Sequence, residues 1–546
     1  MSEVATSNEA GGRVPPARPA RRATSGAVFV FAGMLCSRLL GLVRESLKAK
    51  YFGATEGYAA DAFAQAFRIP NLMQVLLGEG VLSASLIPVY VSVREGSGER
   101  GPDPREADRV AGAIAAALAL VAAGVVAIGV VAAPILVRVI APGFVKEPDK
   151  FALTVQLTRI FFPGAGFFVL SAWCLGVLNS HRRFLLSYIA PAIWNLAMIA
   201  TLLWYGRRLD LAPLAAAAAW GSLAGAALQF LVQLPTVLRV APHLRFRPDF
   251  KHVHVRTVLR NVVPVVIGRG VLQLSATIDQ VISSLLPNGM PALLFNAQTV
   301  STLPVSLFGM ALSASELPEM SSLSGTDAER AEGLRRRLIP GLRRIAYLVV
   351  PSAMALIALG DVIVKLLFQH GLFRAYDTQL TWSILAGSAV GLLAQTLSRL
   401  YSSAFYALQD TRRPLYYAIT RLSLTLSLGW IFAIPVPRAL GIDPHWGAAG
   451  LTATAGFAGW IEFALLRRGL ERRIGAASIP MRFVAKLWAI AFGAAVVALV
   501  VKVATLGSNR YVAAAAILGS YGCCYLGGTL LAKIPEVHEV AGRFRR

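Results

Sequence analysis

Charged residues lie at helical spacing inside the first long apolar segment of this chain, in the stretch SRLLGLVRESLKAKYFG (residues 37–53). Arg38, Glu45 and Lys48 are separated by seven and then three positions, which places them on one face of an α-helix. Arg44 lies beside Glu45 and widens that face. Because a guanidinium group can bind phosphate oxygens through two parallel hydrogen bonds, an arginine-rich face indicates an anionic ligand such as pyrophosphate.

Further charges lie in two other apolar segments. Asp61, Arg68 and Glu79 belong to the segment that begins near residue 62, and Arg269 belongs to the one that begins near residue 257. A charge at the centre of a bilayer costs about 2.5–3.5 kcal/mol, so we expect these side chains to face protein or a water-filled cavity.

The carboxylates and lysines of these segments also have structural interpretations. Glu45 could equally neutralise a neighbouring arginine, and Asp61 could stabilise the N-terminus of its own helix. Glu79 could be the structural partner of an arginine. Lys48 and Lys50 are best explained as side chains that extend to the outer membrane interface. The cations that outnumber the nearby carboxylates, and that we predict to bind the substrate, are Arg38, Arg44 and Arg68.

The composition requires a membrane-embedded fold for these residues. The chain has 546 residues, of which 56% are hydrophobic and 15% charged, and its mean hydropathy is +0.60. These values are typical of an all-α polytopic membrane protein. The net charge of +24 is explained by lysine and arginine in cytoplasmic loops, so we predict no nucleic-acid partner.

Other kinds of chemistry lack a sequence signal. The four cysteines have neither a disulfide pattern nor a metal-ligand spacing, and no histidine cluster is present. There is no phosphate-binding loop of an ATPase and no nucleophile motif. We therefore predict that the protein is not an enzyme and binds no cofactor or metal. We expect any transport to be driven by an ion gradient, the membrane potential or product removal.

We predict fourteen transmembrane helices, because apolar segments alternate with charged or Pro- and Gly-rich breaks. Residues 1–24 are predicted to form a disordered basic tail. Arginine-rich and cation-poor loops alternate, which predicts that both termini are cytoplasmic. The predicted helices start near residues 26, 62, 109, 152, 184, 212, 257, 291, 338, 377, 415, 446, 482 and 511.

An internal repeat divides these helices into two lobes. The tetrapeptide Leu-Ser-Ala-Ser occurs at residues 82–85 and again at 312–315, 230 positions later, and Arg182-Arg183 has the same offset to Arg412-Arg413. We predict two pseudo-symmetric six-helix lobes with a site at their interface, as in transporters. The predicted domains are the N-lobe (25–240), the C-lobe (241–475), and two C-terminal helices with the cytoplasmic C-terminus (476–546).

Several long motifs resemble the family of bacterial lipid II flippases. Residues 37–90 are similar to the N-terminal signature of that family. Further similar stretches follow in the family's order, at residues 176–199, 303–321, 367–378 and 404–414. The family belongs to the multidrug/oligosaccharidyl-lipid/polysaccharide exporter superfamily.

The resemblance implies a function and a set of ligands. Such proteins carry an undecaprenyl-pyrophosphate-linked peptidoglycan precursor (lipid II) from the cytoplasmic to the periplasmic leaflet of the inner membrane, for cell wall synthesis and cell shape. By resemblance, lipid II and membrane lipids are the expected partners, and the chain is expected to be a monomer, alone or with the cell wall synthesis machinery. The residues that match the family's substrate-site positions are Arg38, Arg44, Asp61, Arg68 and Glu79.

Two positions depart from the family's pattern. The family usually has a cation shortly after Pro70-Asn71 and another in the next lobe, where this chain has Gln74 and Thr299. We predict that Arg269 replaces these missing ligands.

We predict a mechanism of alternating access, in which the two lobes rock about the cavity and Gly41, Pro70 and Pro304 allow bending. Three alternatives stay open. A flippase for another polyprenyl-linked oligosaccharide would use the same cationic cavity. A drug or cation antiporter of the same superfamily would need carboxylates in the cavity. An enzyme that acts on lipid-linked sugars would need a catalytic constellation.

Overall fold

The computed structural model describes residues 21–96, 101–306, 320 and 326–537, and every regular element in these residues is helical. The helices of the first half are α1 (Arg21–Phe52), α2 (Ala59–Leu77), α3 (Glu79–Glu95), α4 (Pro104–Ile140), η1 (Pro142–Lys146), α5 (Pro148–Ser180), α6 (Phe184–Tyr205) and α7 (Leu211–Val240). Those of the second half are α8 (Val253–Ser283), α9 (Met290–Pro304), α11 (Asp327–Ala358), α12 (Gly360–Leu367), α13 (Ala375–Val390), α14 (Leu392–Ala407), α15 (Arg412–Ala433), α16 (Pro435–Ala439), η3 (Pro444–Trp446) and α17 (Gly447–Ile474). Two last helices follow, α18 (Met481–Ala504) and α19 (Arg510–Leu531).

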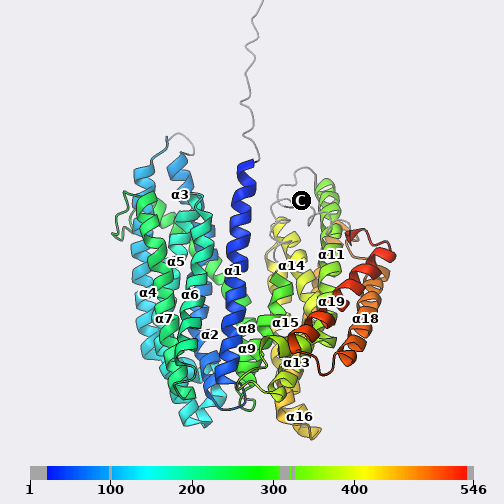
Figure 1. Cartoon of the computed structure of the whole chain (residues 1–546). Helices are drawn as coiled ribbons and strands as arrows, with labels where there is room; N and C mark the ends of the chain where they lie inside the picture. The colour runs from blue at the N-terminus through cyan, green and yellow to red at the C-terminus, as the bar shows by residue number, and fades with distance from the viewer. Residues whose placement is uncertain (1–20, 97–100, 307–319, 321–325, 538–546) are drawn as a thin grey trace, which may run out of the picture.

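The helices form two side-by-side groups (Figure 1). Helices α2 to α7 make up the first group, and α11 to α17 make up most of the second, with α1, α8 and α9 drawn between the two. The final pair, α18 and α19, packs against α11 and α12 on the outside of the second group. A site that both groups share can form where their helices meet.

The two halves repeat the same order of helices. α6 begins at residue 184 and α15 at residue 412, 228 positions later, while α5 and α13 begin at residues 148 and 375, 227 positions apart. These spacings agree with the offset of 230 in the sequence repeat. The second Leu-Ser-Ala-Ser copy, at 312–315, lies outside the described residues.

The helix starts agree well with the sequence predictions. Thirteen of the fourteen predicted starts lie within five residues of the start of a helix, and the ninth helix, α11, begins eleven residues earlier, at Asp327 rather than near 338. The reason is that α11 opens with a charged turn, which Thr326 and Glu329 stabilise as a capping box. Hydropathy alone misses such a polar extension.

The long apolar helices identify a multi-pass membrane protein. In the part of the chain that the structure describes, nine helices are long and apolar enough to span a membrane, and the bent pair α13–α14 raises this to ten. Helices α1, α2, α3, α8 and α9 are not in this set. Three of them, α1, α2 and α9, carry the polar residues of the site described below.

The core explains how the groups are joined. One large apolar cluster contains Phe63 of the first group and Leu338 of the second, together with Phe52 of α1 and Leu293 of α9. A second cluster is confined to the first group, except that it also contains Val255 and Val258 from the first turns of α8. Helix α8 therefore begins against the first group and ends within the cluster that both groups share.

Candidate functional site: a cationic cavity between the helix groups

A cavity of about 320 Å³ lies between α1, α2 and α9. Its wall contains three guanidinium groups and one carboxylate, so its charge is positive. The residues that line it are Arg38, Gly41, Leu42, Arg44, Glu45, Arg68, Phe295, Gln298, Thr299, Thr302 and Leu303. The three arginines predicted from the sequence are thus brought to one cavity, and the predicted face of the first helix forms one of its walls.

Arg44 and Glu45 form a network of hydrogen bonds in this wall. Arg44 donates from Nη2 to Glu45 Oε1 at 2.5 Å and from Nη1 to Asn195 Oδ1 at 2.8 Å. The guanidinium also lies 4.3 Å from the centre of the Trp194 ring. Asn195 in turn donates to the carbonyl oxygen of Ser37, which fixes α6 against α1. The fork of Arg44 is therefore held in place before any ligand arrives.

Lys48 belongs to the same charged group, and the prediction that its side chain extends to the outer membrane interface was wrong. Its Nζ donates to Glu45 Oε2 at 2.7 Å and lies 4.8 Å from the ring centres of Phe63 and Phe295. The helical spacing of three from Glu45 makes this pair possible. Glu45 is confirmed as the local partner of the helix-1 cations, because it pairs with Arg44 on one side and Lys48 on the other.

Arg38 reaches the cavity from α1 and Arg68 reaches it from α2. Arg38 Nη1 donates to the hydroxyl of Ser306 at 2.5 Å, and Arg68 Nη2 donates to Gln298 Oε1. Arg68 and Gln298 are 230 positions apart, which is the offset of the internal repeat. Equivalent positions of the two halves therefore touch at the cavity, as they do where a pseudo-twofold axis passes between repeats.

Aromatic packing fixes α2 at the cavity wall. Phe67 stacks on Trp194 with ring centres 5.9 Å apart, and its ring meets Phe161 and Phe295 edge-on. These contacts come from α6, α5 and α9, so three helices fix the rotation of α2. Such aromatic pairs each add roughly 0.5–1.5 kcal/mol beyond the burial of their surface. The rotation of α2 is what directs Arg68 toward the cavity.

Asp61 was predicted to bind the substrate, but the structure places it away from the cavity wall. Its side chain is fully buried and accepts hydrogen bonds from the backbone N–H groups of Gly289 and Ala292, at 2.8 and 3.0 Å. It also pairs with Lys150 Nζ at 2.9 Å. Asp61 therefore joins α2 and α5 of the first helix group to the N-terminus of α9, where a carboxylate is electrostatically favoured.

Further contacts join the two groups at the same end of the molecule. Thr55 donates to Asp377 Oδ1 at 2.7 Å, Arg374 Nε lies 2.6 Å from Glu56 Oε1, and the N–H of Leu372 donates to the carbonyl oxygen of Lys50 at 2.9 Å. We call this set of contacts, together with the Asp61–Lys150 pair and its two backbone donors, the lobe clasp.

Gly371 permits the closest approach in the lobe clasp. Its φ is +65°, and a Cβ at this position would lie 2.2 Å from the carbonyl oxygen of Lys50. His370, its neighbour, lies within hydrogen-bonding distance of Ser46. No side chain other than hydrogen fits at residue 371 without moving α1 away from this loop.

Two predicted site residues cannot be assigned to the cavity. Glu79 begins α3 and Arg269 lies within α8, but their side chains lie outside the described residues. Arg421 of α15 and Glu462 of α17 form an ion pair at 3.0 Å. Within the described residues, no group of three or more His, Cys, Asp or Glu side chains is arranged to hold a metal ion.

Sequence reasoning missed the residues whose roles depend on distant partners. Lys150 lies near the start of its helix, where a lysine is typical of the membrane interface, and Gln298 and Ser306 carry no charge that would single them out. One signal was available for Gln298, because it is the repeat equivalent of Arg68 at an offset of 230. Nothing comparable marks Ser306 or Asn195.

The comparisons with protein families give a single consistent result. Residues 48–525 match the model of the family described as lipid II flippase MurJ. The lipid II flippase MurJ of Burkholderia cenocepacia is 33% identical over 445 residues, covering 80% of this chain and 82% of that protein. A probable lipid II flippase MurJ from Rhizobium tropici is 32% identical over 450 residues, covering 82% and 80% of the two chains.

Solved structures support the same fold. A lipid II flippase MurJ in an inward closed conformation superposes with a TM-score of 0.74 at 22% identity, covering 93% of this chain and 99% of that one. An inward-facing multidrug transporter of the MATE family, from the MOP superfamily, superposes with a TM-score of 0.62 at 16% identity, covering 83% of this chain and 100% of that one. The second similarity concerns the fold alone.

Proposed function

Because the chain belongs to the lipid II flippase MurJ family, we propose that it moves lipid II from the cytoplasmic to the periplasmic leaflet of the bacterial inner membrane. It is a multi-pass transporter of a flippase family and not an enzyme. The observation that carries the proposal is the cavity in which Arg38, Arg44 and Arg68 converge between the two helix groups. Lipid II presents a pyrophosphate, a sugar-peptide head group and a polyprenyl tail, and these three parts need different surroundings.

The arginines supply the site for the pyrophosphate. Guanidinium forks hold phosphate oxygens bidentately, and three of them against one carboxylate leave an excess of positive charge for a dianionic ligand. Arg44 is already oriented by Glu45 and Asn195, so little side-chain freedom is lost when the ligand binds. The neutral Gln298, Thr299 and Thr302 lie on the α9 wall and offer hydrogen bonds to the sugars.

One position of the cavity wall, residue 299, lacks the cation that the family pattern leads us to expect. Thr299 stands where a cation is usual in the family, and it lines the cavity beside Gln298. We propose that Glu79 and Arg269 act as further head-group contacts when the cavity opens, and that Asp61 acts on transport indirectly, through the lobe clasp.

The contacts that join the two groups support alternating access. The lobe clasp joins the groups at one end through a buried ion pair, backbone hydrogen bonds and a close glycine contact. We propose that this end is periplasmic and that the structure represents a state closed on that side. Opening of the clasp, coupled to closure at the opposite end, would then present the pyrophosphate to the periplasmic leaflet.

We propose fourteen membrane spans. Nine are the apolar helices and the tenth is the bent pair α13–α14. The remaining four are α1, the broken pair α2–α3, α8 and the segment that begins with α9. Six helices on each side then make the N-lobe and C-lobe, approximately residues 25–240 and 241–475, with α18 and α19 following as a separate pair against which the polyprenyl tail can lie. Arginine-rich loops support a cytoplasmic location of both termini.

The charge of the cavity argues against a drug or cation antiporter. Such a protein would need to bind a cation, but a wall of three arginines and one already paired glutamate repels it. A flippase of another polyprenyl-pyrophosphate oligosaccharide would meet the same arginines, and only the head group would distinguish it from lipid II.

Growth of a bacterial strain depleted of its own flippase tests the proposal. The wild-type chain should restore growth, whereas Arg44→Ala and Arg68→Ala should not, despite normal amounts in the membrane. Arg207→Ala is the matched control, because Arg207 is an exposed arginine between α6 and α7, away from the cavity. Growth supported by both cavity variants would refute the assignment of the pyrophosphate site.

A further inference from the structure

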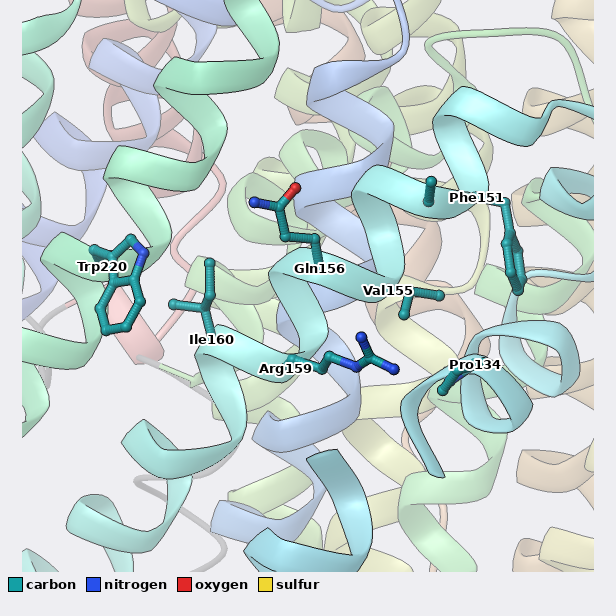
Figure 2. A pocket seen from close by; sticks show the side chains of 8 residues that line it. Pro134, Phe151, Val155, Gln156, Arg159, Ile160 and Trp220 are labelled. Atoms are coloured by element: carbon teal, nitrogen blue, oxygen red, sulfur yellow. The ribbon is translucent and has the colours of Figure 1, made fainter. Parts of the chain in front are cut away.

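A second cation-containing hollow lies on the outer surface of the first helix group. This lipid-facing groove has a volume of about 500 Å³ and is formed by α4, α5 and α7 (Figure 2). Its lining is mostly apolar, with Arg159 as the one charged member among Pro134, Phe151, Val155, Ile160 and Trp220. None of these residues lines the cationic cavity between the groups.

The surroundings of the groove are those of a surface in contact with lipid tails. Val131 and Ile135 of α4 are 79% and 63% exposed, and Trp220 of α7 is 58% exposed. A continuous exposed apolar surface of this kind is expected on a helix that faces the bilayer. Arg159 and Gln156, one helical turn apart on α5, are the exposed polar side chains on this face.

Arg159 lies well inside the span. It is eleven residues after Pro148, the first residue of α5, which corresponds to roughly 17 Å along the helix axis. An arginine at such depth carries a cost of up to about 2.5–3.5 kcal/mol unless its charge finds a partner. Helical side chains point toward the N-terminus of their helix, so the guanidinium reaches back toward the end of α5 at which the lobe clasp lies.

Part of this guanidinium has a structural role. Pro134 lies inside α4 and has no N–H, so the carbonyl oxygen of Val130, four residues earlier, loses its helical donor. Arg159 Nε donates to this oxygen at 3.3 Å, and Figure 2 shows the guanidinium extending toward Pro134. This hydrogen bond holds the side chain across the groove rather than letting it extend freely to the water.

The rest of the guanidinium has no protein partner within the described residues. No carboxylate pairs with Arg159 there, and its two terminal nitrogens make no hydrogen bond in that part of the chain. A cation with a free pair of donors that is open to lipid, with an exposed tryptophan farther along the same groove, has the complement of an anionic lipid: a phosphodiester beside apolar chains.

We propose that this groove is a binding site for an anionic phospholipid. Its phosphate accepts hydrogen bonds from the terminal nitrogens of Arg159, while an acyl chain lies along Ile160 and Trp220. The lipid neutralises the membrane-embedded charge, and Pro134 provides both the hollow and the carbonyl that orients the arginine. The site is separate from the transport cavity, so it does not depend on the proposed function.

Native mass spectrometry of the purified full-length protein tests the proposal directly. Phosphatidylglycerol should remain bound more strongly than phosphatidylethanolamine, which is neutral overall. Arg159→Gln should weaken phosphatidylglycerol binding by about tenfold, the loss of one charge-assisted contact of roughly 1.4 kcal/mol. Arg207→Gln is the matched control and should bind phosphatidylglycerol like the wild type, because Arg207 is exposed outside the groove.

Thermal unfolding supplies a second readout that a folding defect does not imitate. Phosphatidylglycerol should raise the Tm of the wild type and of Arg207→Gln, and this lipid-dependent rise should be lost in Arg159→Gln whatever its Tm without lipid. Inorganic phosphate alone should give no rise. Equal binding of the two lipids, equal phosphatidylglycerol binding by Arg159→Gln, or an equal effect of free phosphate would each overturn the proposal.

Discussion

The buried pair between Asp61 and Lys150 gives the sharpest prediction about conformational change. The two side chains are 0% and 1% exposed, and Nζ and Oδ2 are 2.9 Å apart. Asp61 also accepts the N–H groups of Gly289 and Ala292. Asp61→Asn removes the negative charge, leaves the buried Lys150 with Glu147 Oε1, 3.7 Å away, as its remaining counter-ion, and turns one acceptor into a donor that faces the N–H of Gly289 or Ala292.

The expected magnitude follows from burial. Removal of one partner of a buried ion pair costs about 3–5 kcal/mol in the state that contains the pair. If the clasp parts during transport, that cost falls on the closed state alone, because the pair becomes hydrated when the end opens. Even about 3 kcal/mol corresponds to a change of more than roughly a hundredfold in the ratio of closed to open molecules.

The assay measures how often the clasp opens. Ala54 is 0% exposed in the loop between α1 and α2 at the closed end. In a chain whose four native cysteines are replaced by serine, the thiol introduced by Ala54→Cys should react slowly with a membrane-impermeant thiol reagent. The rate of this labelling at residue 54 is proportional to the open fraction, so Asp61→Asn should raise the rate by about two orders of magnitude.

Asp149→Asn provides the matched control. Asp149 is an exposed carboxylate one residue before Lys150, so the same substitution there should leave the rate of labelling at residue 54 unchanged. A rate for Asp61→Asn equal to that of the control would refute the reasoning, because the pair would then persist in both states or contribute nothing to closure.

Three further predictions follow from the same contacts. Gly371→Ala should lower the Tm and speed the labelling at residue 54, because a Cβ would lie 2.2 Å from the Lys50 carbonyl oxygen at a φ of +65°. Gly441→Ala is the control, because Gly441 has a φ of +66° with open space around it and shares only the backbone strain. Equal effects of the two substitutions would contradict the close contact. Arg44→Lys should weaken binding of a pyrophosphate-linked lipid by about tenfold in a titration, because an ammonium group cannot contact Glu45 and Asn195 at the same time as a planar guanidinium does. Full affinity of the Arg44→Lys variant would mean that a positive charge alone is sufficient. Burial beside Arg510 and Lys50 lowers the pKa of His370 below its ordinary value of 6.5. The closed state of the lobe clasp therefore binds fewer protons than the open state, and it loses stability as pH falls below about 6.5. The labelling at residue 54 should be faster at about pH 5.5 than at about pH 7.5, and His370→Gln should remove that difference.

Local sequence patterns predicted the helices and the face of the first helix well. Apolar runs between charged breaks locate helix starts, because the bilayer imposes both length and composition on a span. The spacing of Arg38, Arg44 and Glu45 was enough to place them on one cavity wall, since helical periodicity fixes which residues share a face.

Partners that are distant in the chain could not be predicted in this way. Asp61 shares a face of α2 with Arg68, seven residues later, yet the first binds the start of α9 and the second reaches the cavity. Their separation of roughly 10 Å along the helix is enough to place one in the lobe clasp and one in the site. Lys48 was misassigned for a related reason, because only the packed structure shows the Phe63 and Phe295 rings that surround it.

Bending of the second span shows the same limit. Pro70 was the predicted point of bending, but α2 continues to Leu77, and the break that separates α2 from α3 is at Gly78. A proline in a helix removes one hydrogen bond, which neighbouring helices can tolerate in a membrane, whereas the extended backbone of Gly78 ends the helix outright.

The central claim is that the arginines of the cavity carry the pyrophosphate of lipid II across the membrane. The most direct measurement is the leaflet distribution of lipid II in cells depleted of their own flippase and supplied with this chain, read by an externally added enzyme that cleaves only periplasmic lipid II. The account predicts that the wild-type chain and Arg207→Ala make lipid II accessible to the enzyme, and that Arg44→Ala and Arg68→Ala leave it in the cytoplasmic leaflet. Accessible lipid II with both cavity variants, or inaccessible lipid II with the wild-type chain at normal expression, would contradict it.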